Sequence, residues 1–230
     1  LKFANSSYYG FSKSISTLSE ALVRLGASSV YNMLTASMTN ASLSQEIRGY
    51  RLASGELWEH SIACAIATQM LADQLKLKDM KFAFTAGLLH DFGKVVLGKF
   101  IDEKVCSEIE FLVQKGRSFY ESEKAVLGIN HAELGAVIMK TWNIPDTLTE
   151  VVRWHHKPDA LPENQVAALV NIADHICLRN NIGTRPGTFV GPFDTSLIET
   201  FKITPEIANE VIDQTRNSLA KIKDVFSKRD

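Results

Sequence analysis

Helical patterning along almost the whole chain is the feature that most limits how this sequence can fold. The segment 55–75 places apolar residues near helical spacing, among them Leu57, Ile62 and Ile66, and has no internal glycine or proline. No stretch alternates between apolar and polar residues for long enough to predict a strand, and no internal repeat is present. The sequence therefore predicts an all-α fold, a multi-helix bundle.

Local start and stop signals divide this pattern into separate helices. Thr17 and Glu20 have capping-box spacing, and Gly26 is placed to end the helix that they begin. Asn130 and Glu133 form a second capping box. Further expected features are a short helix over 28–38, breaks at Gly93 and Gly116, a helix between Pro145 and Pro158, a Gly/Pro-rich loop at 183–192 and a last helix that starts at Thr204–Pro205.

The charge pattern excludes several classes of protein. The 25 Lys and Arg residues almost balance the 26 Asp and Glu residues, so there is no strong basic field for nucleic acid or an anionic membrane. The first two helices resemble a helix-turn-helix, but the second, SSVYNMLTASM, contains no Lys or Arg to anchor a phosphate. We therefore expect no direct nucleic-acid binding. No stretch is apolar for long enough to predict a membrane span.

Cysteine usage indicates a reducing compartment. Cys64, Cys106 and Cys177 are far apart and show no CxxC spacing, which is typical of small apolar residues rather than disulfides. No N-terminal signal pattern is present. We expect a cytoplasmic protein. The chain begins at Leu1 within a segment typical of a helix, so we also expect it to be part of a longer protein.

Metal-ligand side chains recur on five successive predicted helices. They are, in chain order, His60, His90, Asp91, His131, His155, His156 and Asp174. A single buried histidine is usually satisfied by a hydrogen bond within the core, but a series on successive helices calls for another explanation. Helical bundles build metal sites from side chains on facing helices, so the series predicts a metal site. His175 would point about 100° away from Asp174 on a helix, so we expect it at the surface or behind the ligands.

The order of these residues resembles the HD superfamily of metal-dependent phosphohydrolases, and more narrowly the HDOD domain of bacterial signalling proteins. The blocks that carry the resemblance are LKFANSSYYGFSKSISTLSEALVRLG, LWEHSIACAIA, AGLLHDFGKVVL, NHAELGAVIMKTWNIPDTLTEVVRWHHKP and LVNIADHI. The resemblance implies an HDOD domain over 1–180, with an N-terminal helical part at 1–50 and an HD-like core at 51–180. The loop and helix of 181–230 would complete the domain.

The resemblance also implies one or two divalent metal ions, and with two ions Asp91 would be shared between them. One ion would be held by His60, His90, Asp91 and Asp174, and the other by Asp91, His131, His155 and His156. Imidazole and carboxylate ligands suit iron, manganese, zinc or nickel. Glu59 and Glu133 are candidates to orient His60 and His131 from behind, although the capping role of Glu133 competes with this.

Two functions follow from the resemblance. A metal-dependent phosphohydrolase would use Asp91 and the ions on a phosphoester or nucleotide, with Lys94 receiving a phosphate oxygen; the alternative for Lys94 is a solvated side chain at a helix end. A non-catalytic signalling scaffold would bind protein partners instead, with its metal structural or absent, since many HDOD members have lost several ligands. The segment HHKPDALPENQ lacks the Glu-Arg pair and the Gly-Tyr-Pro block of cyclic-di-GMP phosphodiesterases, so that activity is not expected.

Overall fold

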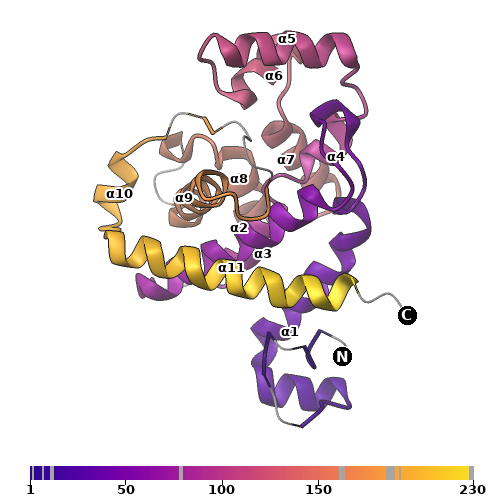
Figure 1. Ribbon diagram of the computed structural model, residues 1–230, viewed down its shortest axis with the longest axis vertical. Helices are drawn as coiled ribbons and strands as arrows, with labels where there is room; N and C mark the ends of the chain where they lie inside the picture. Colours follow the sequence, from indigo (N-terminus) through magenta and orange to yellow (C-terminus); the bar gives the residue numbers. More distant parts are fainter. Residues whose placement is uncertain are drawn as a thin grey trace.

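The computed structural model describes residues 1–227 apart from 2, 7, 11–12, 78–79, 161–163, 185–189 and 192. Within these residues the chain is helical and forms no β-strand; one isolated antiparallel bridge joins Ile47 and Leu52. The predicted all-α class is therefore confirmed (Figure 1). Most of the loop predicted at 183–192 lies outside the described residues.

The elements follow one another without long insertions. They are α1 (Leu18–Leu43), the 3-10 turn η1 (Arg48–Tyr50), α2 (Glu56–Gln74), α3 (Ala83–Leu89), α4 (Gly93–Leu97), α5 (Glu103–Gln114), α6 (Phe119–Leu127), α7 (His131–Thr141), α8 (Asp146–Trp154), the 3-10 turn η2 (Pro158–Ala160), α9 (Gln165–Arg179), α10 (Ser196–Thr200) and α11 (Pro205–Ser227). α1 changes direction at Gly26, where φ is 79°, as the stop signal predicts. Its second half continues to Leu43, beyond the expected end at residue 38.

The apolar helix α2 runs through the middle of the bundle, and α3, α9 and α11 pack around it (Figure 1). Small residues allow this close packing: Ala63 and Ala65 are fully buried, and a Cβ added to Gly87 of α3 would lie 2.7 Å from the backbone oxygen of Cys64. The close approach of α3 to α2 brings the end of α3 near His60.

The junction between α3 and α4 differs from the expected break at Gly93. Helix α3 ends at Leu89, and Gly93 is instead the first residue of α4. A Cβ on Gly93 would overlap the backbone oxygen of His131, so α4 crosses the first turn of α7 in backbone contact. The glycine is needed for this crossing, which puts Asp91 beside His131.

Helices α5 and α6 form a small unit at one end of the molecule (Figure 1). Its separate apolar cluster contains Leu97, Ile101, Cys106 and Ile109. The predicted elements do not include α6, which begins after Ser118; the Ser118 side chain accepts a hydrogen bond from the N–H of Glu121 at 3.4 Å. This helix proves important because Glu123 on it is fully buried.

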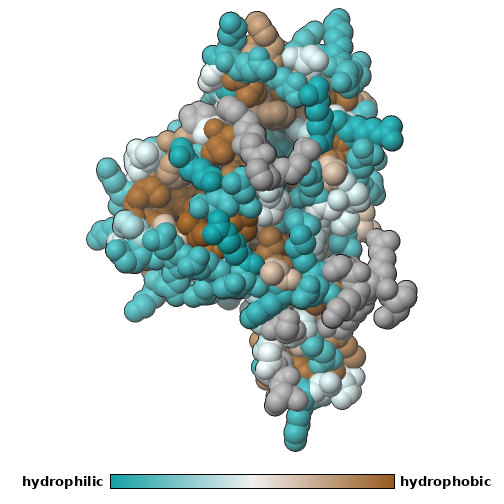
Figure 2. Space-filling model, in the orientation of Figure 1, coloured by the Kyte–Doolittle hydropathy of each residue, from teal (hydrophilic) through white to brown (hydrophobic). Residues whose placement is uncertain are grey.

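The last helix, α11, lies across α2 and α9. Its predicted start is confirmed, because the Thr204 hydroxyl accepts a hydrogen bond from the N–H of Ile207 at 3.3 Å. The surface along α11 is hydrophilic, and an apolar patch lies between α9 and α10 (Figure 2). Among the described helices, none combines the length and the apolar character needed to cross a bilayer. The domain division at residue 180 stays a prediction.

Candidate metal centre

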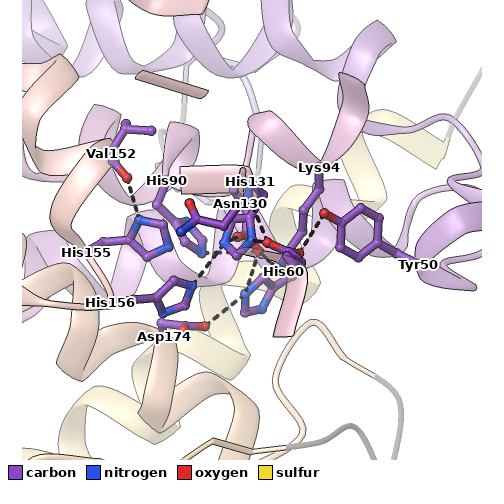
Figure 3. Close-up of polar contacts among 12 residues, drawn as sticks. Tyr50, His60, His90, Lys94, Asn130, His131, Val152, His155, His156 and Asp174 are labelled. Atoms are coloured by element: carbon purple, nitrogen blue, oxygen red, sulfur yellow. Dashed lines mark hydrogen bonds and ion pairs between the residues drawn. The ribbon is translucent and has the colours of Figure 1, made fainter. Parts of the chain in front are cut away.

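The seven predicted ligands come together from five parts of the bundle. Figure 3 labels all of them except Asp91. His60 comes from α2, His90 and Asp91 from the α3–α4 junction, His131 from the start of α7, His155 and His156 from the end of α8, and Asp174 from α9. They form two adjacent groups, and within each group the ligand atoms lie within 4.8 Å of one another. The convergence of these side chains is a property of the fold. Metal binding by them stays a prediction.

The first group contains His60, His90 and Asp174, together with Cys64, which is not among the predicted ligands. Nε2 of His60 lies 3.1 Å from Oδ1 of Asp174 and 3.6 Å from Sγ of Cys64. All four side chains are buried. Cys64 sits one turn after His60 on the same face of α2, which is why it reaches the same point.

The second group contains Asp91, His131, His155 and His156. Nε2 of His131 lies 3.2 Å from Oδ1 of Asp91 and 3.0 Å from Nε2 of His156. Three of the four residues are buried, whereas His156 is partly exposed. The backbone oxygen of His155 accepts a hydrogen bond from the Asn171 side chain at 2.7 Å, which ties the end of α8 to α9.

Asp91 lies between the two groups and faces both. Its Oδ1 is the oxygen next to His131, whereas its Oδ2 lies 3.4 Å from Nε2 of His90 and 3.7 Å from Nε2 of His60. A carboxylate with one oxygen toward each group is placed to bridge two ions. The shared role that the family resemblance implies for Asp91 stays a prediction.

Hydrogen bonds behind the rings set the tautomers of three histidines. Nδ1 of His90 lies 2.8 Å from the backbone oxygen of Gly87, and Nδ1 of His155 lies 2.7 Å from that of Val152. A carbonyl only accepts, so each Nδ1 carries the proton and each Nε2 keeps its lone pair. Nδ1 of His131 is paired in the same way with a carboxylate oxygen of Glu123, at 2.7 Å. Metal-binding imidazoles usually have such partners.

Three of the inward-facing ligand atoms make no hydrogen bond within the described residues. They are Nε2 of His90, Nε2 of His155 and Oδ1 of Asp91. Two of the three lie at ion-pair distance from a neighbour, Oδ1 of Asp91 from His131 and Nε2 of His90 from Oδ2 of Asp91. A buried polar atom that makes no hydrogen bond costs roughly 1–3 kcal/mol, so folds rarely keep three of them in one place. Each has a lone pair aimed at its group, and a bound cation would satisfy them. The residues present therefore fit a metal centre.

Charges and burial in the centre favour the cation-binding forms of Asp91, Asp174 and His155. At His90 and His131, by contrast, burial is outweighed by nearby carboxylates, which raise the pKa values of both rings. Burial opposes ionisation of Asp91, but Lys94 and His90 hold the pKa of that carboxyl well below its ordinary value. Burial also opposes ionisation of Asp174, yet the hydrogen bond from His60 lowers its pKa to about 2. Burial, reinforced by the nearby His90, lowers the pKa of His155 to about 3, so this ring is neutral.

Glu123, which is not among the predicted residues, contacts the ring of His131. Burial is the largest influence on the pKa of His131 and would lower it, but the charge and hydrogen bond of Glu123, together with the hydrogen bond to Asp91, raise that pKa to about 9. The other oxygen of Glu123 accepts a hydrogen bond from the Tyr50 hydroxyl at 2.7 Å. No local sequence signal distinguishes the role of Glu123 from that of the neighbouring Glu121, because the partners of Glu123 lie on other elements.

The predicted supporting residues took other roles. Glu59 faces α11 and pairs with Lys223 at 2.8 Å. Glu133 completes the α7 cap, where its N–H donates to Asn130 at 2.8 Å, and its carboxylate pairs with Lys124. His175 lies outside both groups, as expected, and its ring stacks on Phe193 with centroids 4.3 Å apart.

Lys94 is not a solvated lysine at a helix end. Its Nζ lies 2.5 Å from Oδ2 of Asp91 and its side chain is 20% exposed. Its ammonium group thus reaches the Asp91 carboxylate from the same turn of chain. The predicted contact of Lys94 with a phosphate oxygen stays a prediction.

A surface cavity of about 570 Å³ adjoins the second group. Its lining includes His156, and around it four basic side chains outnumber two acidic ones: Arg117, Lys124, Arg153 and Lys157 against Glu121 and Glu133. The Tyr120 ring stacks on His156 with centroids 4.8 Å apart and forms part of the wall. The cavity therefore offers an anionic molecule a route to a candidate ligand.

A helical fold with histidines and aspartates converging in this order is that of an HD-superfamily domain. The sequence matches the HDOD domain family over residues 1–158. The chain belongs to the HDOD domain family.

The chain is also similar to individual proteins. It is 26% identical over 223 residues to an uncharacterised protein of Treponema pallidum, covering 95% of this chain and 42% of that protein. It is 32% identical over 128 residues to ribonuclease Y of Lawsonia intracellularis, covering 56% of this chain and 18% of that one. The solved structure of a candidate phosphohydrolase from Shewanella amazonensis matches with a TM-score of 0.72 at 22% identity, covering 98% of this chain and 80% of that one. The chain thus spans less than half the length of the curated relatives it matches.

Proposed function

We propose that this chain is a signalling domain that binds two divalent transition-metal ions and hydrolyses a phosphoester with them. The observation that carries the proposal is the set of unpartnered lone pairs on His90, His155 and Asp91, which converge in a buried site. His60, His90 and Asp174 would hold one ion, and His131, His155 and His156 the other, with Asp91 between them. Iron, manganese, zinc and nickel all suit these ligands.

The residues around the two groups support a phosphoester as the substrate. Divalent ions bound there would supply Lewis-acid stabilisation of a phosphoester and a nucleophile derived from water. The basic cavity beside His156 would bind and orient the anionic group. Lys94 would contact a phosphate oxygen while it neutralises Asp91. The similarity to ribonuclease Y supports a phosphodiester in particular.

Lys94 also favours a second candidate, a non-catalytic scaffold that acts through protein partners. Its ammonium group already balances the charge of Asp91 at 2.5 Å, so the centre does not depend on a metal ion for that charge. In this alternative the histidines are structural. For either role we propose the cytoplasm, because Cys64, Cys106 and Cys177 are all free thiols.

Metal content per chain tests the proposal. Wild type, Asp91→Ala and the control His175→Ala are incubated separately with zinc, manganese, iron(II) or nickel, desalted and measured by elemental analysis. We expect close to two ions per chain in the wild type and in His175→Ala, and a clear loss in Asp91→Ala. A wild type that retains no ion from any of the four solutions contradicts the metal centre.

Hydrolysis is tested next, with the loaded wild type on a panel of chromogenic phosphodiesters, cyclic and linear nucleotides and short RNA. We expect turnover that disappears in Asp91→Ala although the variant keeps its helical circular dichroism spectrum. Metal binding without turnover on any of these substrates would favour the scaffold, and the search would move to protein partners.

A further inference from the structure

Cys64 lies at the first metal group, although the family resemblance assigns it no role. Its Sγ is 3.6 Å from Nε2 of His60, and it lies within 4.8 Å of the ligand atoms of His90 and Asp174. The side chain is fully buried. We propose that Cys64 is a thiolate ligand of the first ion, beside His60, His90 and Asp174. This inference rests on the proposed metal centre.

The donor atoms lie close enough together to share one ion. With a Zn–S bond of about 2.3 Å and a Zn–N bond of about 2.0–2.1 Å, a tetrahedral ion holds S and N roughly 3.5–3.6 Å apart. Sγ of Cys64 lies 3.6 Å from Nε2 of His60 and 3.8 Å from Nδ1 of the same ring. For N and O the same bond lengths give roughly 3.3 Å. The separation between His60 and Asp174 is 3.1 Å.

The unpartnered Nε2 of His90 is a second, independent sign of a ligand at this point. The ring is fully buried, its Nδ1 is committed to Gly87, and its Nε2 has no hydrogen bond within the described residues. Cys64 offers this nitrogen no strong donor, because a thiol is only a weak one. A cation between them would be bound by both.

Cys177 is a control for the effect of burying a thiol that is not a candidate ligand. Cys177 on α9 is as fully buried as Cys64 and neighbours it, but it is not among the residues whose ligand atoms converge. Both thiols pack in the same apolar core. Replacing each in turn therefore separates ligation by Cys64 from the general effect of losing a buried thiol.

A thiolate in only one group would make the two ions different. Thiolate ligands select zinc, iron and related thiophilic ions, whereas the second group has only imidazole and carboxylate donors. Binding of the first ion would release the Cys64 thiol proton to water, because a coordinating thiol is deprotonated. The first site would thus take a thiophilic divalent ion even where the second accepts manganese.

Cobalt(II) reports this ligand directly, because a cobalt–thiolate bond gives a charge-transfer absorption in the near ultraviolet. The full chain is stripped with a chelator and loaded with cobalt, as wild type, Cys64→Ser and Cys177→Ser. We expect the absorption in the wild type and in Cys177→Ser, and its loss in Cys64→Ser. Cobalt bound by the second group should remain visible in Cys64→Ser through its weaker ligand-field bands.

A measurement on the unmodified chain covers the case in which Cys64→Ser does not fold. X-ray absorption of the zinc-loaded wild type should show a sulfur neighbour at about 2.3 Å in addition to nitrogen and oxygen at about 2.0–2.1 Å. Bound cobalt without the charge-transfer absorption, or zinc without a sulfur neighbour, overturns the assignment of Cys64 and leaves the metal centre standing. A wild type that binds neither ion overturns both.

Discussion

One carboxylate oxygen of Glu123 accepts two hydrogen bonds from His131, one from its backbone N–H at 2.8 Å and one from its ring Nδ1 at 2.7 Å. The backbone bond holds the first residue of α7 in place, and the ring bond turns Nε2 toward Asp91. Glu123 is itself held by Tyr50, so three elements fix the orientation of one ring. Helix α6 therefore serves the centre without supplying a ligand to it.

Replacing Glu123 by glutamine should weaken metal binding without removing a ligand. The amide is a poorer acceptor than the carboxylate, so His131 becomes both less basic and less well oriented. We expect metal affinity to fall by about 10–100-fold, as is typical when the partner of a metal-binding histidine is changed. Competition titration with a chromophoric chelator measures this fall.

Glu133→Gln is the matched control for Glu123→Gln, because Glu133 lies two residues from His131 but pairs with Lys124 instead. It should bind metal as the wild type does. Equal affinities in Glu123→Gln and the wild type would show that the Glu123–His131 bond has no part in metal binding.

Gly93→Ala should destabilise the chain. The added methyl group would overlap the backbone oxygen of His131 and push α4 away from α7. Overpacking of this kind costs about 1–3 kcal/mol in the free energy of unfolding. Chemical denaturation followed by circular dichroism measures the loss, and Lys99→Ala, at an exposed position just after α4, should leave the stability nearly unchanged. If Gly93→Ala is as stable as the wild type, α4 and α7 can move apart without loss of unfolding free energy, and the glycine is not needed for their packing.

Lys94→Ala should separate binding of metal from binding of phosphate. Removing the ammonium group leaves every proposed ligand in place, so the metal content should not fall. If Lys94 contacts a phosphate oxygen during hydrolysis, turnover should fall by about 100-fold, the usual effect of losing one donor to a developing charge. Elemental analysis and steady-state kinetics on the same preparation give both values. Unchanged turnover would assign Lys94 the role of neutralising Asp91 alone.

The basic cavity should govern affinity for anions and leave the metals untouched. The double variant Arg117→Gln/Lys157→Gln removes two positive charges from the wall beside His156. Near the surface each charge contributes up to about 1 kcal/mol, so we expect inhibition by inorganic phosphate to weaken by several-fold to about 10-fold. The effect should shrink as salt is added. Lys104→Gln, on the exposed side of α5, is the control, and an equal change in both proteins would exclude the cavity as the entry route.

Much of the helical structure can be predicted from the sequence because the signals that specify helices are local. Helical periodicity predicts α2, the Asn130 cap predicts the start of α7, and Thr204 predicts the start of α11, since each signal acts within about one turn of chain. The candidate ligands were found in the same way, as polar residues that interrupt apolar helices. Their order along the chain is enough to predict a metal centre.

The tertiary structure decided what those residues touch. Glu59 and Glu133 are close to His60 and His131 in sequence, yet neighbours on a helix point in different directions, and these two face Lys223 and Lys124. Glu123 and Cys64 took their places because α6 docks beside α7 and because α3 and α9 close over one face of α2. Contacts between helices depend on how whole elements pack, which no local pattern records. The sequence determined which groups were available for a metal centre, and the packing of the helices decided which of them meet.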